Sequence, residues 1–207
     1  MNYKNLIPNR DTRLKILGML EFIPDKLMLM IQYRIKTGKK LNLSNPQRFT
    51  EKIQWYKLNY RDPLMTICSD KYQVREYVKG KGLEEILVPL YGFYTDANEI
   101  DFQKLPSKFV LKTTNASHTN ILCKDREKLN IDETRRLLNQ WLKKRTVKSG
   151  REWAYYNIKP LIICEKYLET DKNNDLIDYK FYGFRGKVEY VKVIMNRFSR
   201  EGHSIGI

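Results

Sequence analysis

The chain changes its hydrophobic pattern near residue 106, and this change limits the folds that it can adopt. Before that point, apolar residues recur at helical spacing. After it come short apolar runs of strand length, bounded by proline, glycine or small polar residues, at positions 108–112, 121–123 and 161–165. The chain is therefore predicted to be α+β, with a helical front and a mixed-strand back.

The front of the chain predicts several short helices. Residues 12–36 form two helical segments separated at Pro24, because proline cannot continue a helix. A further helix is expected over residues 46–59, and another begins at Ser69 or Asp70, which can cap its N-terminus. In the back, a helix is expected over residues 133–145. Residues 178–184 and 188–195 then alternate around a turn at Arg185-Gly186, which predicts a β-hairpin.

Composition excludes several classes of protein. The 207 residues are 42% apolar, enough for one domain or two small ones with a real core, and not a disordered chain. Three cysteines without a CxxC spacing and two histidines argue against a disulfide framework or a zinc site. The longest apolar run, residues 27–31, is too short to span a bilayer, and the N-terminus lacks the features of a signal peptide. We expect a reduced, cytoplasmic protein.

The chain is strongly basic, with 39 Lys and Arg against 24 Asp and Glu, a net charge of +15. Residues 1–60 carry a net +8 of this charge, from 12 basic and 4 acidic residues. This balance indicates an anionic partner or simply a basic surface. Nucleic acid is an unlikely partner, because no RNP-like, zinc-finger or helix-turn-helix signature is present.

Residues 12–36 interleave apolar and basic side chains and leave two interpretations open. A basic amphipathic helix pair can lie on an anionic membrane surface. The more ordinary interpretation, which we favour from sequence, is a helical hairpin with its apolar face against the core.

Two lysines stand where a phosphate could bind. Lys112 ends an apolar strand and precedes a small polar loop, residues 113–120, whose amides could cover an anion. Asp70-Lys71 opens a helix, and the N-terminal end of a helix attracts negative charge. The alternative at each position is a solvated lysine at the end of a secondary-structure element.

Three later segments carry further candidates. Glu165-Lys166-Tyr167-Leu168 follows a buried strand, and such a segment can hold a flat heterocycle through its backbone. Asp178 and Lys180 share one face of the predicted hairpin and can line a polar site. Arg197 follows the next strand, and its guanidinium is a candidate to bind a phosphate or a carboxylate through two hydrogen bonds. An exposed ion pair is the alternative for Asp178 and Lys180.

The order of these pieces resembles the ATP-grasp superfamily, and in detail the TupA-like ATP-grasp family named for teichuronopeptide biosynthesis. The resemblance extends from about residue 41 to residue 207 and rests on the series Asp70-Lys71, Phe109-Val110-Leu111-Lys112, Ile162-Ile163-Cys164-Glu165, Asp178-Tyr179-Lys180-Phe181 and Met195-Asn196-Arg197. Members are often found with bacterial capsule and exopolysaccharide genes, and some carry a glycosyltransferase label.

The resemblance implies an ATP-dependent carboxylate–amine ligase and assigns a role to each candidate. Lys71 and Lys112 would face the phosphates of ATP, and the loop with Thr113 and Ser117 would cover them. The adenine would lie against the hinge formed by Ile163, Cys164, Glu165, Lys166, Tyr167 and Leu168. Asp178 would hold the ribose, and Lys180 and Arg197 would contact the triphosphate or the acyl phosphate as catalytic residues. The implied partner is an anionic sugar or uronic-acid polymer precursor, with peripheral contact at the inner membrane face.

One departure from the superfamily concerns magnesium. The family holds Mg with an acidic residue and a Glu-x-Asn pair on later strands, and no such pair follows Arg197 here. The resemblance therefore implies an ATP-grasp fold that is incomplete at its C-terminal end, and whether the chain is an active enzyme stays open. A sugar-nucleotide glycosyltransferase and a degenerate, non-catalytic nucleotide-binding relative are the alternatives.

The expected organisation has four segments. Residues 1–60 form a basic helical region, and residues 61–105 form a helix-rich lead-in with the first lysine. Residues 106–169 form the small ATP-grasp subdomain with the adenine hinge, and residues 170–207 form part of the C-terminal subdomain.

Overall fold

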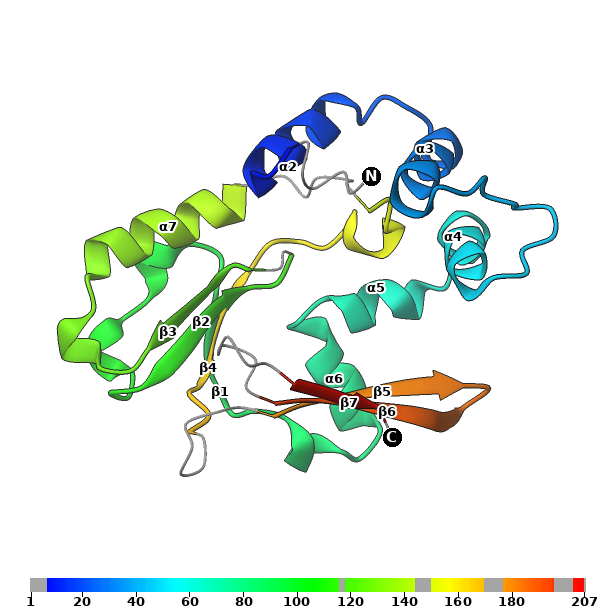
Figure 1. The fold of residues 1–207 in the computed structure, drawn as a ribbon. Helices are drawn as coiled ribbons and strands as arrows, with labels where there is room; N and C mark the ends of the chain where they lie inside the picture. Colours follow the sequence, from blue (N-terminus) through cyan, green and yellow to red (C-terminus); the bar gives the residue numbers. More distant parts are fainter. Residues whose placement is uncertain (1–6, 116–117, 144–149, 170–176, 196–202, 207) are drawn as a thin grey trace. The chain divides into compact units, whose positions relative to one another are not determined.

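A computed structural model describes residues 7–115, 118–143, 150–169, 177–195 and 203–206 (Figure 1). It divides the chain into two compact units, Met1–Lys166 and Tyr167–Ile207. The first unit contains helices and an antiparallel sheet, and the second contains an antiparallel sheet. Both agree with the prediction of an α+β chain. The fold class predicted from sequence is confirmed.

In its described residues, the first unit opens with the helices α2 (Arg10–Met19), α3 (Asp25–Thr37), α4 (Phe49–Asn59), α5 (Pro63–Ser69) and α6 (Gln73–Gly80). Pro24 separates α2 from α3, as its sequence position predicts. Gly38 ends α3 in the left-handed conformation, with φ of 71°. Helix α5 was not expected from sequence. It begins at Pro63, and the residue before it, Asp62, is its N-cap. The Asp62 carboxylate accepts a hydrogen bond from the Leu64 amide at 2.9 Å.

A four-stranded sheet follows in the first unit, with the strand order β1-β4-β2-β3 and antiparallel pairing throughout. Its strands are β1 (Leu90–Tyr94), β2 (Phe109–Thr113), β3 (Asn120–Cys123) and β4 (Ile162–Lys166). Helix α7 (Ile131–Lys143) follows β3. Short 3-10 turns connect these elements: η1 (Glu84–Ile86), η2 (Ala97–Glu99), η3 (Phe102–Lys104), η4 (Arg126–Lys128) and η5 (Trp153–Tyr155).

The main core lies between α7 and one face of this sheet (Figure 1). Phe109 and Leu111 of β2 pack there with Cys164 of β4 and Leu138 of α7, and all four are almost fully buried. Successive residues of a strand point to opposite faces. Val110 and Lys112, with Ile163 and Glu165, therefore lie on the other face of the sheet.

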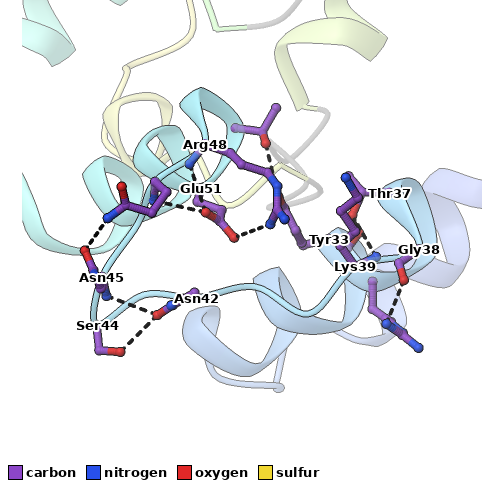
Figure 2. A network of polar contacts seen from close by, with 12 residues as sticks. Tyr33, Thr37, Gly38, Lys39, Asn42, Ser44, Asn45, Arg48 and Glu51 are labelled. Carbon is purple, nitrogen blue, oxygen red and sulfur yellow. Dashed lines mark hydrogen bonds and ion pairs between the residues drawn. The ribbon is translucent and has the colours of Figure 1, made fainter.

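A smaller core joins the first helices, where Leu29 and Tyr33 of α3 pack with Leu41. Next to it, Glu51 is nearly buried at the start of α4 and is the centre of a polar network (Figure 2). Its carboxylate accepts hydrogen bonds from the Arg48 amide at 3.0 Å and the Gln47 amide at 3.1 Å, and it pairs with the Arg48 guanidinium at 3.0 Å. These donors lower the pKa of Glu51, with the Arg48 amide as the largest cause.

A buried arginine ties the first helices to the chain that leads into β4. The Arg151 guanidinium donates to the Asp25 carboxylate at 2.8 Å and to the Leu20 carbonyl at 2.9 Å. Arg151 is almost fully buried and has a φ of 51°, which is unusual for a residue with a side chain. The beginning of α3 is therefore anchored by a charge pair as well as by apolar packing.

The second unit is a three-stranded antiparallel sheet with the order β5-β6-β7. Strands β5 (Asp178–Phe184) and β6 (Lys187–Met195) form the predicted hairpin. Arg185 and Gly186 have φ of 51° and 78°, as a two-residue turn with two left-handed residues requires. Strand β7 (His203–Gly206) was not expected from sequence.

The described fold predicts how the three thiols react. Cys123 and Cys164 are buried, and Cys68 is exposed. Burial raises the pKa of the Cys164 thiol to about 12, and it raises the pKa of Cys123 as well. In a titration with a thiol-reactive disulfide at pH 8, we expect Cys68 to react rapidly in the native protein and the other two only after denaturation. Rapid reaction of a Cys68→Ser variant would contradict this packing.

Candidate functional site

The site begins at the end of β2, on the face of the sheet away from α7. Lys112 pairs in register with Ile163, and Val110 pairs with Glu165, so Lys112 and Glu165 share this face. The Lys112 ammonium contacts one oxygen of the Glu165 carboxylate at 2.7 Å. The lysine predicted to bind phosphate is thus paired with Glu165, one of the residues of the predicted hinge.

Arg75 of α6 binds the other oxygen of the same carboxylate, at 3.1 Å. Its guanidinium also donates to the Val88 carbonyl at 2.6 Å, just before β1. The Arg75 and Glu165 side chains are 11% and 9% exposed, whereas Lys112 is 31% exposed. Of the two cations on Glu165, Arg75 is therefore the buried anchor and Lys112 is the one within reach of solvent.

Lys71 approaches the same region from the turn between α5 and α6. Asp70 shapes this turn, because its carboxylate accepts a hydrogen bond from the Tyr72 amide at 2.8 Å and from the Gln73 side-chain amide at 2.9 Å. The Lys71 ammonium donates to the Thr113 carbonyl at 2.8 Å, at the end of β2. The sequence prediction of Ser69 or Asp70 as the N-terminal cap of a helix is wrong, because α6 begins at Gln73 with Tyr72 as its N-cap, and Asp70 instead ends α5.

The Lys71 ammonium contacts the carbonyl of Thr113, the residue that follows Lys112, so both lysines lie at the same end of β2. The pKa of Lys71 is lowered, first by burial and then by the positive charge of Lys112. Asp70 and Glu165 act in the opposite direction. Among the described residues, three cations, Lys71, Arg75 and Lys112, thus gather near the carboxylates of Asp70 and Glu165 where β2 ends. Such a cluster can attract an anion with several negative oxygens.

The loop after β2 is fixed at its two ends. The hydroxyl groups of Thr113 and Thr119 are 2.7 Å apart, and the Thr113 amide donates to the Thr119 carbonyl at 3.2 Å. Thr114 exchanges hydrogen bonds with Leu161 through its amide and its hydroxyl. Thr113 is fully buried, so its carbonyl rather than its hydroxyl faces the site. Ser117, the other predicted loop contact, lies outside the described residues.

The predicted hinge follows the central strand β4. Ile163 lies on the face of Lys112, whereas Cys164 points into the core. Strand β4 pairs with β1 and β2 on its two sides, and the Lys166 amide still donates to the Pro89 carbonyl at 2.9 Å. The division between the two compact units falls directly after Lys166, so Tyr167 and Leu168 begin the second unit.

The remaining candidates belong to the second unit. Asp178 and Lys180 lie two residues apart on β5 and so share one face of that sheet, opposite to Tyr179 and Phe181. Arg197 lies outside the described residues.

Sequence reasoning missed Arg75, although a signal was present. Arg75 follows Lys71 by four residues, a spacing that brings side chains to one side of a helical segment. Its partner, Glu165, is ninety residues away, and only the fold brings the two together. The sequence analysis also did not predict the contact between the rings of Tyr72 and Phe93, whose centroids are 4.6 Å apart.

Among the residues that the structure describes, there is no group of three or more His, Cys, Asp or Glu side chains placed to hold a metal ion. In the same part of the chain, no helix has the length and apolar character needed to cross a bilayer.

Comparison with known families gives the class of the protein. Lys71, Lys112 and Glu165 lie inside a match to a family model described as TupA-like ATPgrasp, over residues 51–205. The match covers about three quarters of the chain, which is therefore an ATP-grasp-type protein. It belongs to the TupA-like ATP-grasp family, as its sequence resemblance indicates. No curated protein and no solved structure matches the chain.

The burial of the Arg75–Glu165 pair predicts its effect on stability. An Arg75→Met variant keeps most of the side-chain volume and leaves the buried Glu165 carboxylate with Lys112 alone. Loss of a hydrogen bond to a charged group costs about 1.5–3 kcal/mol, and the Val88 carbonyl loses its donor as well. We expect urea unfolding to show a loss of this size in the free energy of unfolding.

The matched control is Arg136→Met, because Arg136 pairs with Glu133 on the exposed surface of α7. An exposed pair contributes about 1 kcal/mol at most. Equal losses in the two variants would contradict the anchoring role of Arg75.

Proposed function

We propose that the chain binds Mg-ATP, with the ammonium groups of Lys71 and Lys112 on the phosphates. The observation that carries this proposal is the convergence of the two lysines at the end of β2. They come from elements about forty residues apart, yet the charge of Lys112 lowers the pKa of Lys71. Membership of an ATP-grasp family supports ATP as the anion that this cluster binds.

The Arg75–Glu165–Lys112 arrangement would let Lys112 bind a phosphate without leaving the buried Glu165 carboxylate unpaired. Glu165 neutralises Lys112 in the free protein, at 2.7 Å. When a phosphate attracts Lys112, Arg75 still satisfies the buried carboxylate, at 3.1 Å. This matters because an unpaired buried carboxylate carries a large desolvation cost.

The adenine and the ribose are assigned to the segment after β4. The backbone of β4 is already used by β1 and β2, and the Lys166 amide by Pro89. Backbone contacts to an adenine edge therefore fall to Tyr167 and Leu168. Asp178 is proposed for the ribose, and Lys180 with Arg197 for the triphosphate or acyl phosphate, on the basis of the family resemblance.

The proposed reaction is carboxylate–amine ligation. A substrate carboxylate attacks the γ-phosphate of ATP and releases ADP, and an amine then displaces phosphate from the acyl phosphate to form an amide. Lys71 and Lys112 would stabilise the negative charge on the phosphates during transfer. No described residue is assigned as a magnesium ligand. The net charge of +15 supports an anionic acceptor, and we propose a uronic-acid polymer precursor of the bacterial cell surface.

Calorimetric titration of the purified chain tests the phosphate site. We expect Mg-ATP to bind, and Lys112→Ala to weaken binding about tenfold or more, because a charge-assisted contact contributes roughly 1.5–3 kcal/mol. Lys128→Ala is the matched control, since Lys128 is an exposed lysine on η4. Unchanged ATP affinity in Lys112→Ala would refute the assignment.

A parallel titration with UDP-glucose separates the ligase from a sugar-nucleotide glycosyltransferase. Binding of UDP-glucose without binding of Mg-ATP would favour the transferase. If ATP binds at the lysines but no ADP forms with any carboxylate and amine supplied, the chain is a non-catalytic relative.

The lowered pKa of Lys71 gives the proposed site a characteristic pH dependence. Deprotonation removes a positive charge, so ATP affinity falls as the pH rises through the pKa of Lys71, which lies below the usual 10.5. Bound phosphate favours the charged lysine, so binding takes up protons in this pH range. Titrations in buffers of different ionisation enthalpy measure this uptake.

Lys71→Arg is the diagnostic variant, because arginine stays charged throughout this range. We expect it to retain ATP binding at alkaline pH and to lose the proton uptake. Uptake that persists in Lys71→Arg would show that another group titrates.

A further inference from the structure

The start of the first unit exposes a set of large apolar side chains, here named the α2–α3 stripe. Its members are the last residue of α2, one residue of the connection and three residues of α3: Met19, Phe22, Leu27, Ile31 and Ile35. Phe22 is 82% exposed and Met19 is 76% exposed. Single exposed apolar residues are ordinary on protein surfaces, but five of them within residues 19–35 are a concentration typical of an interaction site.

Helix α3 is apolar on two sides. Leu29 and Tyr33 are buried in the small core. Leu27, Ile31 and Ile35 follow one another at intervals of four residues and are all exposed, so they form a separate row along the helix. The interpretation of this region as a core-facing hairpin is therefore true of one side of α3, and the core leaves the other side uncovered.

Positive charge surrounds the stripe. Residues 12–40 contain seven lysines and arginines against Glu21 and Asp25, a net charge of +5. Asp25 is already paired with the buried Arg151, at 2.8 Å. The cations Lys15, Lys26, Arg34, Lys36, Lys39 and Lys40 are all exposed. The surface thus combines apolar side chains with an excess of cations.

We propose that the α2–α3 stripe docks on the surface of an anionic phospholipid membrane. Phe22 and its apolar neighbours would enter the boundary between headgroups and acyl chains, and the lysines would contact the lipid phosphates. A nucleic-acid duplex would attract the cations through its phosphates, but it has no apolar surface that could bury five large apolar side chains. An apolar protein partner would not need the cations. This contact would be peripheral, and it goes beyond ATP binding and does not depend on it.

Co-sedimentation with vesicles tests the proposal. The full chain is mixed with vesicles of phosphatidylglycerol and phosphatidylcholine, or of phosphatidylcholine alone. We expect binding to the anionic vesicles, little binding to the neutral ones, and weaker binding as salt is raised. A folded protein that stays in the supernatant with anionic vesicles overturns the proposal.

Two pairs of variants separate the apolar and the charged contributions. Phe22→Ser with Ile31→Ser removes apolar contacts, and Ile86→Ser with Leu83→Ser removes two exposed apolar residues at η1 as a control. Lys39→Glu with Lys40→Glu reverses two charges near the stripe, and Lys104→Glu with Lys128→Glu reverses two exposed charges elsewhere. We expect each stripe variant to weaken anionic-vesicle binding about tenfold, and each control to change it less than about twofold.

Size-exclusion chromatography and Mg-ATP titration of the same variants complete the test. The proposal requires that the stripe variants keep the oligomeric state and the ATP affinity of the parent protein. If Phe22→Ser with Ile31→Ser converts a dimer to a monomer, the stripe is an interface between two copies and the membrane proposal is wrong. Equal loss of vesicle binding in stripe and control variants would also overturn it. Loss of ATP binding at the lysines with vesicle binding intact would refute only the proposed function.

Discussion

The Glu165 carboxylate organises the site, because each of its oxygens binds a different cation from a different part of the chain. Lys112 approaches along the sheet at 2.7 Å, and Arg75 approaches from α6 at 3.1 Å. Arg75 also holds the Val88 carbonyl before β1. Helix α6, strand β2 and the central strand β4 are therefore connected through one buried carboxylate. Lys71 contacts the end of β2 separately, through the Thr113 carbonyl at 2.8 Å.

The two faces of the sheet have different roles, and alternation along the strands produces both. Phe109, Leu111 and Cys164 fill the core against α7. Their neighbours Lys112 and Glu165 are thereby directed to the opposite face. A well-packed core on one side thus positions charged groups on the other. Helix α3 likewise has two different faces, since Tyr33 is buried in a core and Ile31 is exposed.

Much of this fold could be predicted from the sequence. The break at Pro24, the strands around Val110, Leu122 and Ile163, and the hairpin turn at Arg185-Gly186 follow from local preferences that need no distant contact. The short helix α5 and strand β7 were missed. A seven-residue helix and a four-residue strand carry too little periodic pattern to stand out from a loop.

The sequence by itself determined the α+β class, the family, and which residues were candidates for binding phosphate, since these depend on residue order and local pattern. Only the tertiary structure decided that Lys71 and Lys112 lie together, that Arg75 shares Glu165 with Lys112, and that the apolar row of Leu27, Ile31 and Ile35 stays outside the core. The physical reason is that a charge or an apolar side chain acquires its role from its neighbours. Those neighbours are brought together by folding, and here they come from positions as far as ninety residues apart.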